Sequence, residues 1–273
     1  MTQDGLAPTK IRHALRLRRI TVARIIPLSD TMRRIVFTGE DLHDFVTAGV
    51  DDHVKLFFPQ PGSDTPVLPD LGADRSAPRD PRLIARDYTP RRFDEETREL
   101  IIDFVLHDEG PATQWAAQAK PGHVLGMGGP KASHIAPETL TTHLLIGDDT
   151  ALPAIARTLE TLAPNHRAIV LLDTRETEKA YPLVSHAWIE VHRCEKGGDE
   201  TLPDLLRHVV LPSVEKLNVW IAAEIEIART LRDHLVNEEA VPRTQIRAAG
   251  YWRRGDAAGG ERITDPEAKN GRA

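Results

Sequence analysis

The sequence contains 273 residues, of which 40% are hydrophobic and 28% are charged, and it carries a formal net charge of −6. A chain of this length predicts about two globular domains, and its acidic balance argues against a dedicated nucleic-acid-binding protein. The single cysteine, Cys194, excludes an internal disulfide and any zinc or iron–sulfur site built from several cysteines. There is no secretory signal and no apolar run of membrane-spanning length, so we expect a cytoplasmic protein without stable membrane insertion.

The first half of the chain shows several short β-rich runs separated by turn signals. Residues 1–17 are polar and basic and predict a flexible arm. The runs that follow cover residues 20–26, 32–38, 54–58 and 101–106. Strands at such short spacing are typical of a small β-barrel, which we assign to residues 18–135. A segment rich in Pro, Gly, Asp and Ser at 59–81 predicts a long irregular loop.

The second half alternates strand and helix. Predicted strands cover residues 144–146, 168–172, 219–222 and 244–249, and predicted helices cover 151–162, 202–210 and 225–235. This alternation favours an α/β domain with an open parallel sheet covered on both faces, which we assign to residues 136–255. Residues 256–273 are rich in Gly, Asp, Lys and Arg and predict a disordered tail.

One motif at the end of a predicted barrel strand combines a cation, an aromatic ring and a hydroxyl. In Arg86-Asp87-Tyr88-Thr89, an extended chain directs residues 86 and 88 to one face and residue 89 to the other. A ring, a guanidinium and a hydroxyl donor suit a flavin with its phosphates. The alternative is an ordinary edge strand with exposed polar residues.

A second motif joins a strand to a helix start. The strand at 103–107 runs into Gly110-Pro111, and good helix formers follow from Thr113 to Ala119. Backbone N–H groups and the positive end of the helix dipole gather at such a start, which can bind a pyrophosphate. Alternatively, Thr113 only caps the helix, and His107 is an ordinary surface histidine.

Three later stretches carry weaker signals. Gly126 to Lys131 is a glycine cluster that allows close backbone approach but lacks the P-loop pattern. Gly147 to Pro153 ends a strand at the position where nucleotides bind open α/β sheets. The segment lacks the G-x-G-x-x-G fingerprint, so a tightly held dinucleotide of that geometry is not expected, whereas a transiently bound one is allowed. Ala249 to Gly255 places Tyr251, Trp252 and two arginines at the end of the last strand, either in a site or as a core plug.

Taken together, these stretches resemble the siderophore-interacting protein family, the NAD(P)H-dependent ferric-siderophore reductases of the ferredoxin–NADP reductase-like superfamily. The resemblance extends over about residues 18–255 and rests on segments 86–91, 103–107, 110–116, 129–131, 147–153 and 251–253. One departure is Ala222-Ala223-Glu224, where the family usually carries Ala-Gly-Glu. A methyl group at position 223 could crowd a nucleotide, so the sequence leaves open whether Ala223 weakens nicotinamide binding.

The resemblance implies a role for each matching position. The residues expected to contact FAD are Arg86, Tyr88, Thr89, Asp103, Val105 and His107, with Thr113 at the pyrophosphate. Those expected to shape the nicotinamide site are Gly147, Thr150, Ala151, Pro153 and Glu224. Basic residues expected to hold the iron chelate are Lys55, Lys131 and Arg253.

The function that the resemblance implies is FAD-dependent reduction of a ferric siderophore or other ferric chelate by NAD(P)H, which releases Fe²⁺. The flavin carries the chemistry, so no catalytic side chain, resident metal or nucleic-acid partner is expected, and the protein is expected to be a monomer. A general flavin or quinone reductase and a non-catalytic siderophore-binding protein are alternatives. Arg175 favours NADPH and Asp173 favours NADH, so the sequence leaves the choice of nucleotide open, together with the type of siderophore.

Overall fold

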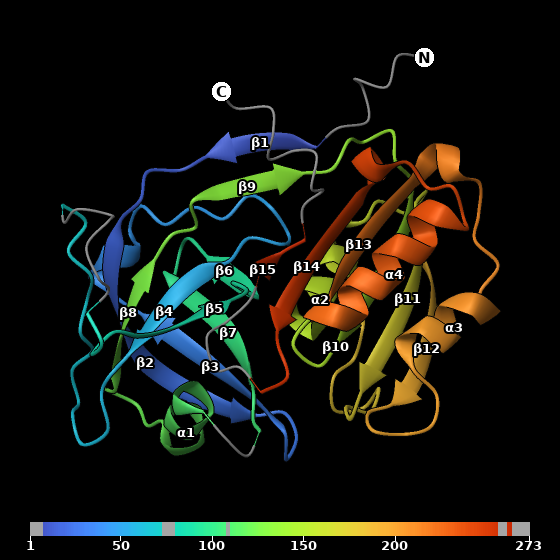
Figure 1. The fold of residues 1–273 in the computed structure, drawn as a ribbon. Helices are drawn as coiled ribbons and strands as arrows, with labels where there is room; N and C mark the ends of the chain where they lie inside the picture. The colour runs from blue at the N-terminus through green and yellow to red at the C-terminus, as the bar shows by residue number, and fades with distance from the viewer. Residues whose placement is uncertain (1–7, 73–79, 108–109, 256–260, 264–273) are drawn as a thin grey trace.

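The computed structural model describes residues 8–72, 80–107, 110–255 and 261–263, and it divides into a β domain and an α/β domain that lie side by side (Figure 1). Within the described residues, the β domain is a seven-stranded antiparallel sheet in the order β5-β4-β8-β2-β3-β7-β6, curled into a half-barrel. Its strands are β2 (Leu17–Pro27), β3 (Met32–Thr38), β4 (Val54–Phe58), β5 (Ile84–Tyr88), β6 (Arg92–Asp94), β7 (Glu99–Val105) and β8 (Val124–Gly128).

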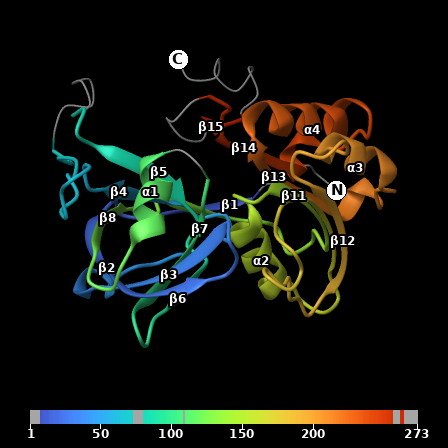
Figure 2. The same cartoon turned by 90° about the horizontal axis from the view of Figure 1, so that it is seen from below.

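The half-barrel closes over an aromatic core. On β4, Val54, Leu56 and Phe58 belong to the barrel core, and Lys55 and Phe57 alternate with them on the other face, where Phe57 is buried as well. Helix α1 (Pro111–Gln118) covers the lower end of the barrel, where Figure 2 shows it from below. Its buried positions include Ala112, Trp115 and Ala116, and the Trp115 ring stacks on Phe37 with centroids 6.3 Å apart.

The α/β domain is built on a parallel sheet. In the described part of the chain its order is β12-β11-β10-β13-β14, with the short strand β15 antiparallel at the β14 edge. The strands are β10 (Thr142–Asp148), β11 (Arg167–Thr174), β12 (Trp188–Glu195), β13 (Leu217–Glu224), β14 (Ile246–Trp252) and β15 (Glu261–Arg262). The strand order reverses at β10, which has β11 on one side and β13 on the other. The switch point therefore lies at the carboxyl end of β10.

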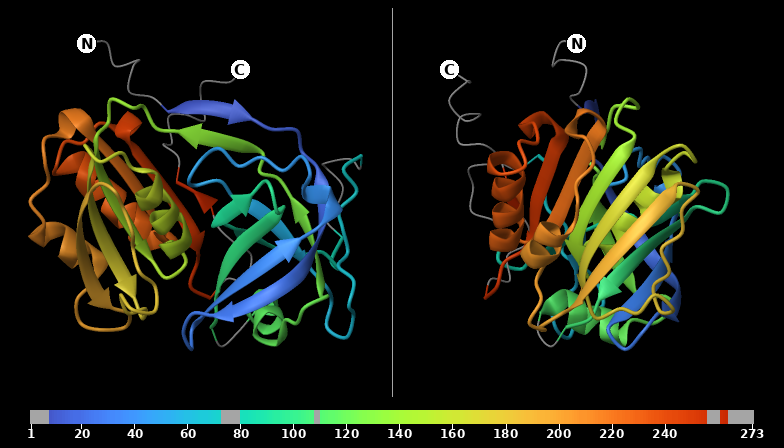
Figure 3. Two further views of the ribbon diagram at one scale, coloured as in Figure 1. Left: turned by 180° about the vertical axis from the view of Figure 1, so that it is seen from behind. Right: turned by 90° about the vertical axis from the view of Figure 1, so that its right-hand side faces the viewer.

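Helices cover both faces of this sheet, as the right-hand view of Figure 3 illustrates for α4. Along β10, Leu144 and Ile146 pack in the core below α3 (Leu202–His208) and α4 (Ile225–Asn237). Leu145 instead packs on the opposite face, against α2 (Leu152–Thr161). A strand that is buried on both sides explains the uninterrupted apolar run that predicted it. Short 3₁₀ turns complete the described elements: η2 (Glu40–Leu42), η3 (Val214–Lys216) and η4 (Arg243–Gln245).

The predicted flexible arm is wrong for residues 9–12. They form β1 (Thr9–Arg12), which pairs antiparallel with β9 (Ala132–Ile135) in a two-stranded ribbon across the top of the barrel (Figures 1 and 3). Pairing with a distant strand satisfies backbone groups that a loose arm would leave to water. Likewise, residues 261–262 of the predicted tail form β15. Three further parts of these predictions lie outside the described residues: residues 1–7 of the arm, residues 73–79 of the loop at 59–81, and residues 256–260 and 264–273 of the tail.

Polar contacts join the two domains. Arg91, at the end of the barrel strands, is buried and forms a two-pronged ion pair with Glu160 of α2. Arg157 of the same helix donates to Thr47 Oγ1 and to the Pro90 carbonyl, each at 2.9 Å. Further bridges run from Ser29 and Thr31 to Glu176, and from Arg247 to Asp51. The domain boundary is therefore fixed by directional bonds that specify one relative orientation.

Among the residues that the structure describes, no helix is long and apolar enough to cross a membrane.

Candidate functional site

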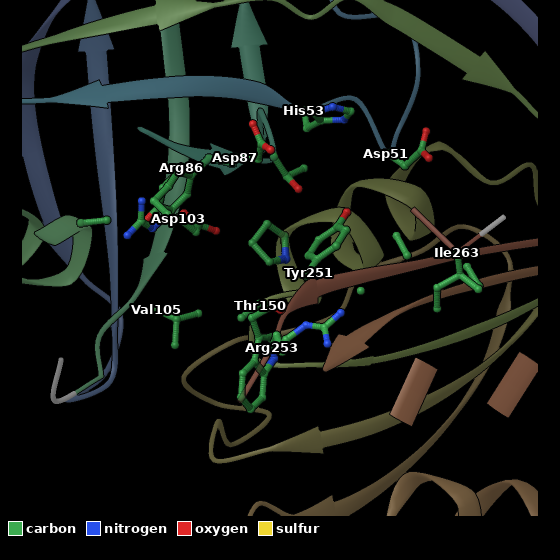
Figure 4. A pocket seen from close by; sticks show the side chains of 18 of the residues that line it. Asp51, His53, Arg86, Asp87, Asp103, Val105, Thr150, Tyr251, Arg253 and Ile263 are labelled. Atoms are coloured by element: carbon green, nitrogen blue, oxygen red, sulfur yellow. The ribbon is translucent and has the colours of Figure 1, made fainter. Parts of the chain in front are cut away.

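A cleft of about 970 Å³ lies between the two domains. In Figure 4, Arg86, Asp103 and Val105 form its barrel wall, and Thr150, Tyr251 and Arg253 come from the α/β domain. The volume is at the upper end of the roughly 300–1,000 Å³ that is usual for ligand sites. The residues predicted to hold a cofactor that line this cleft are Arg86, Tyr88, Thr89, Asp103, Val105, His107, Thr113, Thr150 and Pro153.

Strand β5 presents the ring and the guanidinium as the alternation predicts. Arg86 pairs with Leu56 and Tyr88 with Val54 across the β4–β5 ladder, so both side chains project to the same face. The Tyr88 ring is held 4.5 Å from the Phe104 ring, and burial raises the pKa of its phenol. Tyr88 therefore stays protonated and offers a fixed, neutral aromatic surface. Arg86 is half-buried and donates to the Ala85 carbonyl at 2.7 Å, with further N–H groups left for a ligand.

The start of α1 lies in the same cleft. Gly110 has φ 121°, a conformation that favours glycine, and Pro111 occupies the first helical position. The first helical bond runs from the Gln114 amide to the Gly110 carbonyl at 3.0 Å, so the amides of Ala112 and Thr113 precede the helical ladder. The Thr113 hydroxyl donates to the His107 carbonyl and accepts from its amide. The side chain thus fixes the helix to the end of β7, and the backbone amides remain suited to a pyrophosphate.

Asp103 lines the cleft, but its carboxylate is already bonded to the protein. It accepts from Arg34 Nε at 2.7 Å and Nη2 at 2.9 Å, and from the Tyr181 hydroxyl at 2.6 Å. Burial raises the pKa of the Tyr181 phenol, which keeps its hydroxyl a donor. Because Tyr181 belongs to the α/β domain, Asp103 connects the two halves of the protein. Its predicted contact with FAD stays a prediction.

Three of the residues predicted to shape the nicotinamide site lie behind the cleft wall. A Cβ on Gly147 would meet Ala151 Cβ at 2.3 Å and the Ala222 carbonyl at 2.8 Å, so this glycine lets α2 approach β10 closely. Glu224 caps α4 by accepting from the Glu226 amide at 2.8 Å. Gly147, Ala151 and Glu224 therefore do not line the cleft. They position α2 and α4 against the parallel sheet next to it. Ala223 is fully buried in the core shared with α4 and does not belong to the cleft lining.

The predicted chelate-binding cations occupy different places. Arg253 lines the cleft beside Tyr251 (Figure 4). Lys55 lies next to the cleft without lining it, and its Nζ pairs with the cleft residue Asp87 at 2.7 Å. Lys131 is exposed after β8, outside the cleft lining, and its carbonyl accepts from the His13 amide. The structure therefore places Arg253 in the cleft and Lys55 beside it. Lys131 lies in the segment that follows β8, the strand that pairs with β4 at Lys55.

The aromatic pair that ends β14 belongs to the site as well as to the core. Tyr251 and Thr89 of the barrel both line the cleft, and burial raises the pKa of the Tyr251 phenol. Trp252 Nε1 donates to Asp148 Oδ2 at 2.6 Å, which fixes the indole at the switch point. The sequence marked this stretch but gave no sign that Asp148 anchors it. Cys194 is different: burial raises the pKa of its thiol to about 11, so it is not a reactive thiolate.

Comparisons with known proteins agree with this architecture. Residues 21–134 match the family model for the siderophore-interacting FAD-binding domain, and residues 140–255 match the model for siderophore-interacting protein. The NADPH-dependent ferric-chelate reductase of Escherichia coli (strain K12) is 36% identical over 251 residues, which cover 90% of this chain and 96% of that protein. Ferric vibriobactin reductase ViuB of Vibrio cholerae is 30% identical, with coverage of 84% and 86%.

Solved structures show the same relationship. A siderophore utilization protein from T. fusca superposes with a TM-score of 0.83 at 32% identity, covering 94% of this chain and 98% of that chain. The siderophore-interacting protein SipS from Aeromonas hydrophila superposes with a TM-score of 0.72 at 32% identity, with coverage of 93% and 94%. The sequence predicted a β-barrel flavin-binding domain followed by an α/β domain with an open parallel sheet, and this fold class is confirmed, with the barrel observed as a half-barrel. The chain belongs to the siderophore-interacting protein family.

Proposed function

We propose that this protein uses NAD(P)H and bound FAD to reduce the iron of a ferric siderophore or a related ferric chelate, which releases Fe²⁺. The observation that carries the proposal is that β5 and the start of α1 share one cleft with the switch point of the parallel sheet. The names of the similar reductases from Escherichia coli and Vibrio cholerae support the same reaction. The iron is the substrate in this proposal, and its chelate holds it.

The residues of the cleft fit FAD. The Tyr88 ring offers a surface for the flavin ring, and Arg86 and the Ala112 and Thr113 amides offer donors for its phosphates. FAD, when bound, supplies the conversion of two-electron into one-electron chemistry. The remaining wall, with Thr150 and Pro153 at the carboxyl end of β10, is where the nicotinamide nucleotide would lie. Side chains orient the two groups and exclude water, and none has to move a proton.

Both walls of the cleft come from a single chain, so the site is complete in a monomer, which we propose as the working form. NAD(P)H is a reductant of the cell interior, which favours a cytoplasmic location. The chain has one buried cysteine and therefore cannot form the internal disulfide that an oxidising compartment would support.

Purified protein should carry a flavin absorbance band that bleaches when NADPH or NADH is added without oxygen. Adding a ferric chelate should restore the band and yield Fe²⁺, measured with a ferrous-specific chromogenic trap. A protein without flavin absorbance and without trapped Fe²⁺ would contradict the proposal. Free flavins or dyes reduced as fast as ferric chelates would indicate a general flavin reductase. A bound flavin that NAD(P)H cannot reduce would indicate a siderophore-binding protein.

The Lys55–Asp87 pair gives a test of the chelate site. Ferric tricatecholates are anionic, so Lys55→Ala is expected to lower kcat/KM for such a chelate about tenfold, the equivalent of one charge-assisted bond. Asp87→Asn should act in the opposite direction because it frees the Lys55 ammonium from its partner. Both effects should shrink at high ionic strength, since the pair is partly exposed.

The matched measurement for both variants is FAD affinity, determined by flavin fluorescence. An unchanged affinity with opposite changes in kcat/KM supports a chelate-recognition role for Lys55. Loss of FAD affinity in parallel with chelate reduction would instead reveal a folding defect and would remove Lys55 from the site.

A further inference from the structure

The segment that joins β2 to β3 reaches out of the barrel into the α/β domain. We call residues 28–32, which include the first residue of β3, the β2–β3 turn. Met32 is fully buried in the core that α2 shares with β10 and β11, and Leu28 packs against the same core. Apolar side chains of a barrel turn therefore belong to the core of the neighbouring domain, where they lie between the two walls of the cleft.

One buried carboxylate of the α/β domain holds this turn. Glu176 lies two residues after the end of β11 and is 5% exposed. Its Oε1 accepts from the Ser29 hydroxyl at 2.7 Å and also from the Thr31 hydroxyl. Ser29 Oγ in turn accepts from the amides of Thr31 and Met32, which shapes the turn itself. Because both donors to Glu176 are neutral, an uncharged amide oxygen in the same place would offer them the same acceptor.

The β2–β3 turn is bonded directly to the barrel wall of the cleft. Met32 pairs with Val105 in the β3–β7 ladder, and the Thr31 carbonyl accepts from the Leu106 amide at 2.7 Å. Val105 lines the cleft. His107, the next residue after Leu106, is hydrogen-bonded to the first turn of α1 through both its amide and its carbonyl. A displacement of the turn therefore moves the wall that is proposed to hold FAD.

The backbone of Glu176 is tied to the opposite wall. The Glu176 amide donates to Thr174 Oγ1 at 2.9 Å, and the Thr174 hydroxyl donates to Asp149 Oδ1 at 2.6 Å. Asp149 is fully buried and directly precedes Thr150, which lines the cleft after β10. Glu176 itself is not among the described residues that line the cleft. A continuous chain of hydrogen bonds thus connects the two walls from behind, without contact with a ligand in the cleft.

We propose that Glu176 is a positioning residue for hydride transfer, because its bonds to Ser29 and Thr31 set the distance between the nicotinamide site and the flavin site. The inference rests on the proposed function, which places both groups in this cleft, and adds the contact that aligns them. Transfer of a hydride, with both of its electrons, from the nicotinamide to the flavin requires the reacting atoms to lie about 3–3.5 Å apart. A misplacement of about 1 Å can slow such a step about a hundredfold, even when both partners stay bound.

The test is anaerobic stopped-flow reduction of the bound flavin by saturating NADPH or NADH. Glu176→Ala should lower the limiting rate constant by at least about tenfold. The half-saturating nucleotide concentration and the FAD affinity should change by less than about twofold, because the residues that line the cleft are unchanged. Glu176→Gln should keep at least about half of the unmodified rate, since its amide oxygen still accepts from both hydroxyls. Glu178→Ala, which changes an exposed glutamate two residues further on, is the matched control and should leave the rate unchanged.

Two further measurements separate alignment from a general loss of structure. After reduction by dithionite, the flavin of Glu176→Ala should be reoxidised by a ferric chelate at the unmodified rate, because this half of the reaction does not involve the nicotinamide. Thr31→Val removes one of the two hydroxyls and should also slow flavin reduction, and combining it with Glu176→Ala should slow the reaction no further than Glu176→Ala alone. An unchanged limiting rate in Glu176→Ala, or equal slowing of both half-reactions, would overturn the inference.

Hydrogen exchange of the FAD-free protein gives a readout that does not depend on the reaction. The Leu106 amide, which donates to the Thr31 carbonyl, should exchange at least about tenfold faster in Glu176→Ala than in the unmodified protein or in Glu178→Ala. Unchanged exchange would show that Glu176 does not hold the barrel wall and would contradict the inference. If neither nucleotide reduces the flavin of the unmodified protein, the proposed function fails, and the exchange of Leu106 still decides whether Glu176 positions this wall.

Discussion

Replacing Asp103 with asparagine should lower the free energy of unfolding by about 3 kcal/mol, because it removes one partner from a buried ion pair. The side chain of Asp103 is completely buried, whereas that of Arg34 is 26% exposed, so the loss should lie at the low end for such pairs. The amide that replaces the carboxylate could still accept from the Tyr181 hydroxyl. The missing charge leaves the Arg34 guanidinium without its anion, and urea unfolding of the FAD-free protein measures the cost.

Tyr181→Phe is the matched control for the Asp103 variant. It removes only the 2.6 Å hydrogen bond from the α/β domain, so it should cost about 1 kcal/mol, as is usual for one such bond. The resemblance instead assigns Asp103 a contact with FAD. If that contact dominates, Asp103→Asn will weaken FAD binding while the FAD-free protein keeps its stability, and the structural role proposed for the carboxylate will be wrong.

Acidification should destabilise the protein through His143. This side chain is 5% exposed at the start of β10, and burial together with neighbouring His166 lowers its pKa from 6.5 to about 4. Asn218 Nδ2 lies 3.3 Å from His143 Nδ1 and donates to it, so Nε2 carries the hydrogen, which it donates to His166 Nδ1 at 3.0 Å. The folded protein therefore holds a neutral ring that a proton would disrupt.

The direction of the pH effect follows from the two pKa values. Between pH 6.5 and about 4 the unfolded chain binds a proton at His143 and the folded chain does not, so stability falls as the pH falls. From pH 7 to pH 5 the expected contribution is a loss of about 2 kcal/mol in the free energy of unfolding. Denaturant titrations at both pH values should show this loss shrinking in His143→Gln and persisting in the control His186→Gln, which changes an exposed histidine. Equal pH dependence in all three proteins would refute the role of His143.

Much of the architecture could be predicted because its signals are local. The apolar run of β10, the helical spacing of Leu152, Ile155 and Leu159, and the turn residues between the barrel strands each depend on neighbours in the chain. The family resemblance rested on such segments, and the comparisons confirm it. The prediction that residues 86 and 113 grip one cofactor required both to share a cleft, and both line it.

What escaped prediction depends on contacts between distant residues. Strand β12 mixes polar and apolar residues because it lies at the sheet edge, and only pairing with β11 identifies it as a strand. The partners of Asp103 lie 69 and 78 positions away, so the sequence could show an acidic residue near the motif but not its engagement by Arg34 and Tyr181. The sequence likewise did not show that Glu224 caps α4, because capping is a matter of backbone geometry; its predicted role at the nicotinamide site stays a prediction.

The bridges between the domains have a consequence for the independence of the two halves. Arg91, Asp51 and the Ser29–Thr31 turn find partners in the α/β half, at Glu160, Arg247 and Glu176. Cutting the gene between the halves would give two fragments, and each would expose charged and polar side chains whose partners belong to the other fragment. Neither fragment should be a portable module, so exchanging the nucleotide half between relatives would require transplanting these matched pairs as a set.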